Sequence, residues 1–167
     1  MAESTNPRET LWHLVKGIHF AMITYRHADG SLRACPMTMA NRGGQEERVH
    51  FYFLLSRDSD LARCVTNDGH IQISFADPGA DSYVSVSSYA SLSEDRVLKE
   101  TLWNTAAKAW FTDGVEDVKL AVLVAPVTSA EYWDAQDNKL VQLYRKAKAA
   151  VTGEESVGKG EHQTLRL

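Results

Sequence analysis

The chain has 167 residues, a hydrophobic content of 44%, a charged content of 24% and a formal net charge of −4 at pH 7. These values predict one globular domain with a single core and argue against a nucleic-acid-binding surface. No apolar run is long enough to span a membrane, and the N-terminus lacks a signal-peptide pattern. The two cysteines and six histidines lack the spacings of a disulfide framework or a zinc site. We therefore expect a cytoplasmic protein without a bound metal.

The first half of the chain is predicted to form a short helix and then three strands. Asn6 can cap the helix, with a proline and a glutamate in its first turn, and Gly17 can end it. The Asp29-Gly30 pair is a hairpin signal between the first two strands. The third strand is apolar throughout and should be covered on both faces. The strands are expected at residues 18–25, 32–39 and 49–55.

The second half mixes helices and strands. A short helix is expected to begin at Asp58 or Ser59, and a long helix to open at Ser93 and to stop at Asp113-Gly114. A later strand should be closed by Pro126, and residues 129–134 should form a turn or a short strand. The remaining expected elements are strands at residues 70–76, 83–92 and 119–126 and an amphipathic helix at 138–151.

About six strands lie close together in this sequence. An antiparallel barrel would pair their edges, and an open sheet with one helical layer is the alternative. The predicted domain covers residues 1–152, and residues 153–167 form a polar arm or tail.

Two neighbouring segments carry the candidate binding residues. The strand at 32–39 contains Arg33 and, in its middle, Pro36, which marks an edge or a bulge and leaves backbone groups free for a flat polar ligand. The segment at 54–61 supplies the hydroxyls of Ser56 and Ser59 at a helix start, which favours anions such as phosphate. Together they suggest a site for a ring with a phosphate tail. The alternative is a hairpin strand followed by an ordinary capped helix.

Several short motifs, in their order along the chain, resemble those of a known family. They are Arg33-x-Cys35-Pro36-Met37, Leu55-Ser56-Arg57-Asp58-Ser59, the run at 83–90, Ala109-Trp110-Phe111-x-x-Gly114 and Glu131-Tyr132-Trp133-Asp134. Each motif is weak, but the ordered set resembles the general stress protein 26 family, within the pyridoxamine 5'-phosphate oxidase-like split-barrel flavoproteins. The resemblance runs from about Leu11 to the region of His162.

This resemblance implies a mainly β protein with helices (α+β), a six-stranded antiparallel split β-barrel. It implies a homodimer that holds FMN, or FAD as an alternative, at the dimer interface. By resemblance, Arg33, Ala34, Cys35 and Met37 would lie along the flavin ring, and Ser56 and Ser59 near the ribityl chain or phosphate. The implied set is completed by Leu55, Arg57, Leu61 and Trp110, where Trp110 or Trp103 would approach from the partner subunit.

One position departs from the family pattern. Relatives usually carry a basic residue where this chain has Leu61, and here Asp60 precedes it. Arg57 or Arg63 is a candidate to replace the missing charge; without such a replacement, FMN binding would be weak or absent, or another ligand would be bound.

The functional expectation is a flavin-dependent oxidoreductase acting on an unknown small molecule. The alternative is a non-catalytic flavin-binding protein or a ligand-free dimeric stress protein. No proton donor or paired carboxylates identify a catalytic residue, so the catalytic residues are unknown.

Overall fold

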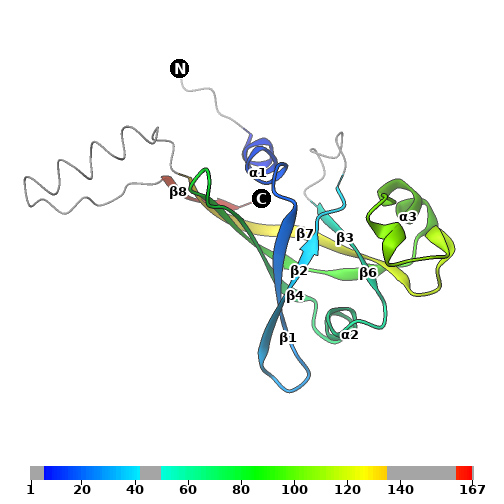
Figure 1. The fold of residues 1–167 in the computed structure, drawn as a ribbon. Coiled ribbons are helices and arrows are strands. Elements are labelled where there is room, and N and C mark those ends of the chain that lie inside the picture. The colour runs from blue at the N-terminus through cyan, green and yellow to red at the C-terminus, as the bar shows by residue number, and fades with distance from the viewer. Residues whose placement is uncertain (1–5, 42–49, 135–160, 167) are drawn as a thin grey trace, which may run out of the picture.

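The computed structural model describes residues 6–41, 50–134 and 161–166. These residues form a mostly antiparallel sheet that curls into a half-barrel, with three α-helices around it (Figure 1). The strands are β1 (Phe20–Arg26), β2 (Leu32–Thr38), β3 (His50–Ser56), β4 (His70–Asp77), β5 (Ser82–Tyr89), β6 (Ser91–Ser93), β7 (Leu120–Asp134) and β8 (Glu161–Arg166). The helices are α1 (Pro7–Val15), α2 (Asp60–Asn67) and α3 (Arg96–Leu102), with 3₁₀ turns η1 (Ala107–Ala109) and η2 (Gly114–Glu116).

Six strands follow one path in the order β2-β1-β4-β5-β7-β3, and β6 and β8 both pair with β7. All the pairings are antiparallel. Within the described residues, the two ends of the path meet at a single bridge between Met39 and Phe53, and the Ala40 amide donates to the Tyr52 carbonyl at 2.8 Å. The sheet is therefore nearly closed but split between β2 and β3. This confirms the predicted antiparallel split barrel.

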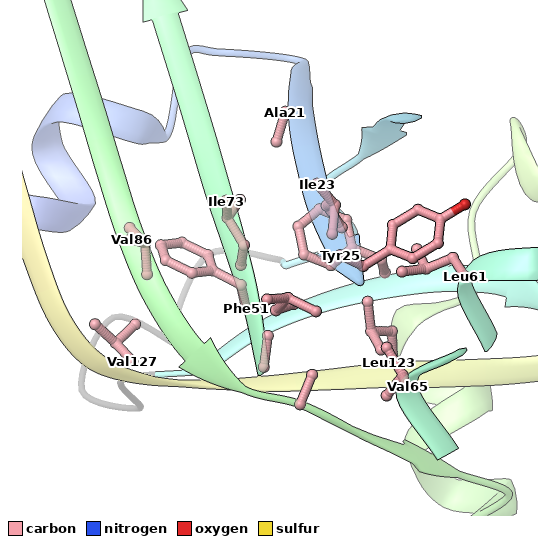
Figure 2. Close-up of a cluster of buried hydrophobic side chains, with 14 of the residues drawn as sticks. Ala21, Ile23, Tyr25, Phe51, Leu61, Val65, Ile73, Val86, Leu123 and Val127 are labelled. Atoms are coloured by element: carbon pink, nitrogen blue, oxygen red, sulfur yellow. The ribbon is translucent and has the colours of Figure 1, made fainter. Parts of the chain in front are cut away.

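The core fills the concave side of the sheet (Figure 2). Strand β4 alternates as predicted, with Ile71, Ile73 and Phe75 buried. Strand β3 is covered on both faces, as its apolar sequence predicted. Phe53 packs in the main core, while Tyr52 packs on the other side with Leu102 and Val122. The curled sheet thus buries one face throughout and the opposite face only around β3 and the first half of β7.

Strand β7 corrects one prediction. Pro126 was expected to close this strand, but β7 continues through it as a single strand of 15 residues that ends at Asp134. Pro126 pairs with His50, the first residue of β3, and the next residue, Val127, pairs with Ser88 of β5. A residue without an amide proton is tolerated here because the strand is changing partners at this point. The residues expected to form a turn or short strand at 129–134 are the second half of β7.

The long helix expected from Ser93 to Asp113 is also wrong. Asp95 caps the much shorter α3 by accepting from the Leu98 amide at 2.7 Å, and Trp103 then has an extended backbone. Leu102 packs with Tyr52 of β3, whereas Phe111 packs in a separate cluster with Leu120 of β7. Of the apolar residues that suggested one helical stripe, Leu98 and Leu102 therefore pack in one cluster and Trp103 in another, while Val97 and Trp110 are exposed.

Other local signals are confirmed. The Asn6 carboxamide accepts from the Arg8 amide at 3.1 Å at the start of α1, although the helix ends at Val15 rather than at Gly17. Asp29-Gly30 forms the β1–β2 turn, in which Gly30 has a φ of +85°. The polar C-terminal segment includes β8, which pairs with the end of β7. The helix predicted over 138–151 and the boundary at 152 lie outside the described residues.

The convex side of the sheet carries exposed apolar side chains. Most of these side chains alternate along their strands with buried residues, and Leu32 pairs with Arg26, which follows the buried Tyr25, so the side chains point outward. We call this surface the open sheet face; its large apolar members are Phe20, Met22, Leu32, Tyr83, Tyr89 and Trp133. None of the described helices is long and apolar enough to cross a membrane.

Candidate functional site

The β1–β2 hairpin holds Arg33 in place at one end of the sheet. The Asp29 carboxylate accepts from the Ser31 amide at 2.9 Å and from its hydroxyl at 2.5 Å. The other oxygen of the same carboxylate accepts from Nη2 of Arg33 at 3.2 Å. The two hydrogen bonds from Ser31 are the main reason that the pKa of Asp29 lies well below its usual range. Asp29 therefore stays ionised at neutral pH, and its carboxylate holds the guanidinium group of Arg33 in place.

The β3–α2 junction places the two candidate serines close together. The Ser59 hydroxyl accepts from the Ala62 amide at 3.2 Å and caps α2, as the sequence predicted. The Ser56 hydroxyl accepts from the Asp58 amide at 3.2 Å, and the Ser59 amide donates to the Ser56 carbonyl at 3.0 Å. Both hydroxyls retain a proton that they can donate to a ligand.

The structure brings Arg33 to the start of α2. Nη1 of Arg33 lies 3.8 Å from Oδ2 of Asp60, and Nη2 of Arg63 lies 2.6 Å from Oδ1 of the same carboxylate. The hydrogen bond from Arg63, with a smaller contribution from Arg33, lowers the pKa of Asp60. The two segments that the sequence singled out, about twenty residues apart, are therefore neighbours in space.

Arg57 lies on the side of the junction that faces α3. Its guanidinium pairs with the carboxylate of Glu94, in the link between β6 and α3. Lys99 donates to the other oxygen of Glu94 at 3.2 Å, and only 9% of its side chain is exposed. The hydrogen bond from Arg57 is the main cause of the lowered pKa of Glu94. Arg57 is therefore anchored away from Arg33 by a three-residue network.

Strand β2 presents an open edge beside these groups. Between Leu32 and Thr38 its strand partner in the described part of the chain is β1 alone. The register pairs Cys35 with Ile23 and Met37 with Ala21, so both side chains lie on the core face. Both are half-buried. Burial raises the pKa of the Cys35 thiol. Ala34 and Pro36 are exposed on the opposite face, so a ligand along this edge would meet small side chains and backbone groups.

Three other predicted site residues are placed differently. Leu55 and Leu61 are buried in the core, and Leu61 is only 3% exposed. Figure 2 shows Leu61 beside Tyr25 on the concave side of the sheet. Their side chains face the core, so they could meet a ligand only through their backbone. Trp110 follows η1, and its side chain is 83% exposed.

The donors at this junction fit a flavin. The edge of β2 offers alternating amides and carbonyls for the polar edge of a flat ring. Ser56 and Ser59 offer hydroxyls, and three guanidinium groups lie on the surrounding elements at Arg33, Arg57 and Arg63. The described residues contain no cluster of three or more His, Cys, Asp or Glu side chains suited to a metal ion.

Sequence reasoning noted Asp60 but not its pairing with Arg33 and Arg63, and it missed the other two carboxylates, Asp29 and Glu94. Asp29 could have been found, because a hairpin turn at Gly30 brings it next to Arg33. Glu94 lies 37 residues from Arg57, and no local pattern links the two.

Comparison with known proteins identifies the family. The model of the family described as "Pyridoxamine 5'-phosphate oxidase like" matches residues 6–156. The chain belongs to this family. The resemblance inferred from the ordered motifs is therefore confirmed.

Relatives within and around the family agree with this assignment. Protein bli-3 of Neurospora crassa is 28% identical over 144 residues, which make up 80% of this chain and 68% of that protein. The structure of a candidate general stress protein 26 from Jannaschia sp. CCS1 is 24% identical, with a TM-score of 0.74 over 93% of this chain and 95% of that chain. The structure of a general stress FMN/FAD binding protein from Xanthomonas citri is 25% identical, with a TM-score of 0.67 over 78% and 90% of the two chains.

Proposed function

We propose that this protein binds a flavin, FMN or alternatively FAD, between the edge of β2 and the start of α2. The observation that carries the proposal is the 3.8 Å distance between Nη1 of Arg33 and Oδ2 of Asp60. It brings the open edge of β2, which would bind the ring, next to the start of α2, whose donors would bind the phosphate. Family membership and the flavin-binding relative from Xanthomonas citri support the proposal.

Each part of the site has a separate task in this proposal. The open edge of β2 along Ala34, Cys35 and Met37 would orient the polar edge of the ring through its outward-pointing backbone groups. Ser56 and Ser59 would bind the ribityl chain or the phosphate. Arg33 and Arg63 would approach the phosphate, and Arg57 would lie on the side of the site that faces α3. The flavin would supply the electron-transfer chemistry, and the chain would bind it and exclude water.

We also propose that the protein acts as a homodimer in the cytoplasm. The open sheet face has six large apolar side chains that a second copy would cover. In such a dimer the exposed Trp110 could reach the ring bound by its partner. Both cysteines are unpaired, which suits a reducing compartment.

The proposed activity is that of a flavin-dependent oxidoreductase with a small-molecule substrate. A second candidate is flavin binding without turnover. It is favoured by the charged side chains of the site, because Arg33, Arg57 and Arg63 are each tied to a carboxylate, and the Cys35 thiol stays protonated. These groups are poor proton donors or nucleophiles.

A flavin titration tests the proposal. We expect the purified protein to bind FMN with a shift in flavin absorbance, and Arg33→Ala to weaken FMN binding about tenfold because it removes the positive charge next to Asp29 and Asp60. Arg96→Ala is the matched control, since Arg96 pairs with Glu100 and Glu116 around α3, outside the site. A protein that ignores riboflavin, FMN and FAD would refute the proposal. Bleaching of the bound flavin by NADH or NADPH would support the oxidoreductase, and flavin that stays oxidised would support binding alone.

A further inference from the structure

The charges around the proposed phosphate position point to a specific selectivity. We infer that the site takes its affinity from the ring and ribityl chain of the flavin and gains little from a terminal phosphate dianion. This inference rests on the proposed function. In this inference, Asp60 determines how strongly the site discriminates between FMN and riboflavin.

The first step is that the arginines of the site are already neutralised. Arg33 lies between Asp29 at 3.2 Å and Asp60 at 3.8 Å. Arg63 lies 2.6 Å from Asp60, and Arg57 pairs with Glu94. Each guanidinium therefore has a carboxylate partner, and a phosphate must compete with that carboxylate for it.

The second step is the sequence at the start of α2. Asp60 is the first residue of the helix and Leu61 the second, and the Leu61 side chain is buried in the core. Hydrogen bonding to Arg63 keeps the Asp60 carboxylate ionised at neutral pH. A phosphate that accepts from the Ser59 hydroxyl would lie close to this negative charge, and no side chain at position 61 could offset it.

The third step is the charge of the phosphate. A phosphate monoester carries between about 1.5 and 2 negative charges at pH 7, because its second pKa is about 6. Its repulsion from Asp60 opposes its attraction to arginines that are already paired. Riboflavin has the same ring and ribityl chain without this charge, so the two ligands should bind with similar affinity.

Calorimetric titration with riboflavin and FMN tests the inference. In the unmodified protein we expect dissociation constants for the two ligands that agree within about threefold. Asp60→Asn should tighten FMN binding about tenfold and change riboflavin binding less than about twofold, because it removes the repulsion of the phosphate and frees Arg33 and Arg63 to pair with it. Asp81→Asn is the matched control. Asp81 lies in the β4–β5 turn with a φ of 51°, a conformation that Asn also adopts, at the end of the sheet away from the β1–β2 hairpin.

A second measurement varies the phosphate charge and leaves the protein unchanged. At pH 5.5 most of the FMN phosphate is a monoanion, so FMN should gain affinity relative to riboflavin compared with pH 7.5. FMN binding more than about 100-fold tighter than riboflavin would overturn the inference and leave flavin binding intact. If Asp60→Asn binds FMN no more tightly than the unmodified protein does, the inference is likewise overturned and flavin binding is left intact. If neither flavin binds, both the inference and the proposed function are wrong.

Discussion

Gly69 and Ala90 touch through their backbones at the base of the half-barrel. The Ala90 amide donates to the Gly69 carbonyl at 2.7 Å, and a Cβ atom at position 69 would lie only 2.5 Å from the Ala90 carbonyl oxygen. This contact joins the end of α2 to the link between β5 and β6. It holds α2, and with it Asp60, against the sheet.

Gly69→Ala should therefore destabilise the protein. The clash would be between the new Cβ atom and the backbone oxygen of Ala90, so it can be relieved only by a shift of the backbone. We expect a loss of about 1–3 kcal/mol in the free energy of unfolding, measured by urea denaturation. Gly17→Ala is the control, because nothing lies within 4 Å of a Cβ atom there. Equal stability of the two variants would show that the contact is looser than the geometry implies.

Acid should weaken the hairpin that carries Arg33. Hydrogen bonds from Ser31 lower the folded-state pKa of Asp29 below its ordinary value of 3.8. A lowered folded-state pKa means that the ionised carboxylate stabilises the fold above about pH 4 and that this stabilisation is lost as the pH falls through the folded-state value. We expect the thermal midpoint to fall between pH 5 and pH 2.5, and to fall less in Asp29→Asn.

The control for the acid experiment is Asp81→Asn, which removes a carboxylate from the opposite turn and leaves the Asp29 contacts in place. Its midpoint should fall with pH as that of the unmodified protein does. Parallel curves for Asp29→Asn and the unmodified protein would contradict the prediction. Asp60, Asp68 and Glu94 also have lowered pKa values, so part of the acid sensitivity should remain in every variant.

Cys35 should react slowly with thiol reagents in the folded protein. Burial raises its pKa, and the thiolate is the reactive form. We expect alkylation by iodoacetamide at pH 7.5 to be at least about tenfold slower than that of free cysteine, and to accelerate at higher pH. Peptide mapping by mass spectrometry separates Cys35 from Cys64, and both should react at the rate of free cysteine in urea. Rapid alkylation of native Cys35 would instead indicate an activated thiol.

A charge on the open sheet face should disrupt the proposed dimer. Met22 lies on this face, so Met22→Lys would place an ammonium group in the interface, where burial without a partner is costly. Sedimentation velocity should give the mass of two chains for the unmodified protein and of one chain for the variant. His13→Lys is the control, because α1 packs against the core side of the sheet. A dimer that survives Met22→Lys would assign the interface to another surface.

Much of the local structure could be predicted because its causes are local. Asn6 and Ser59 cap their helices with hydrogen bonds that reach two or three residues ahead. The Asp29-Gly30 turn depends on one backbone conformation that glycine allows. The alternation of β4 and the continuous apolar sequence of β3 reflect which faces are buried.

The failures have a common cause in contacts between distant segments. Pro126 ends a strand in isolation, but β7 continues because β5 takes over as its partner after β3. The residues after Leu102 continue the helical spacing, but Leu98 and Leu102 pack in one cluster and Trp103 and Phe111 in another, and the helix ends at Leu102. Such outcomes depend on which strand or cluster lies nearby, and spacing along the chain does not contain that information.

The same division applies to the candidate site. The amino-acid sequence was sufficient to identify the family and to select Arg33, Ser56 and Ser59, because ordered motifs and capping signals are properties of short segments. The pairing of Arg33 with Asp60 and of Arg57 with Glu94 became visible only in the folded chain. Electrostatic interactions depend on distance in space, and curling of the sheet brings these charges together from segments that lie 27 and 37 residues apart.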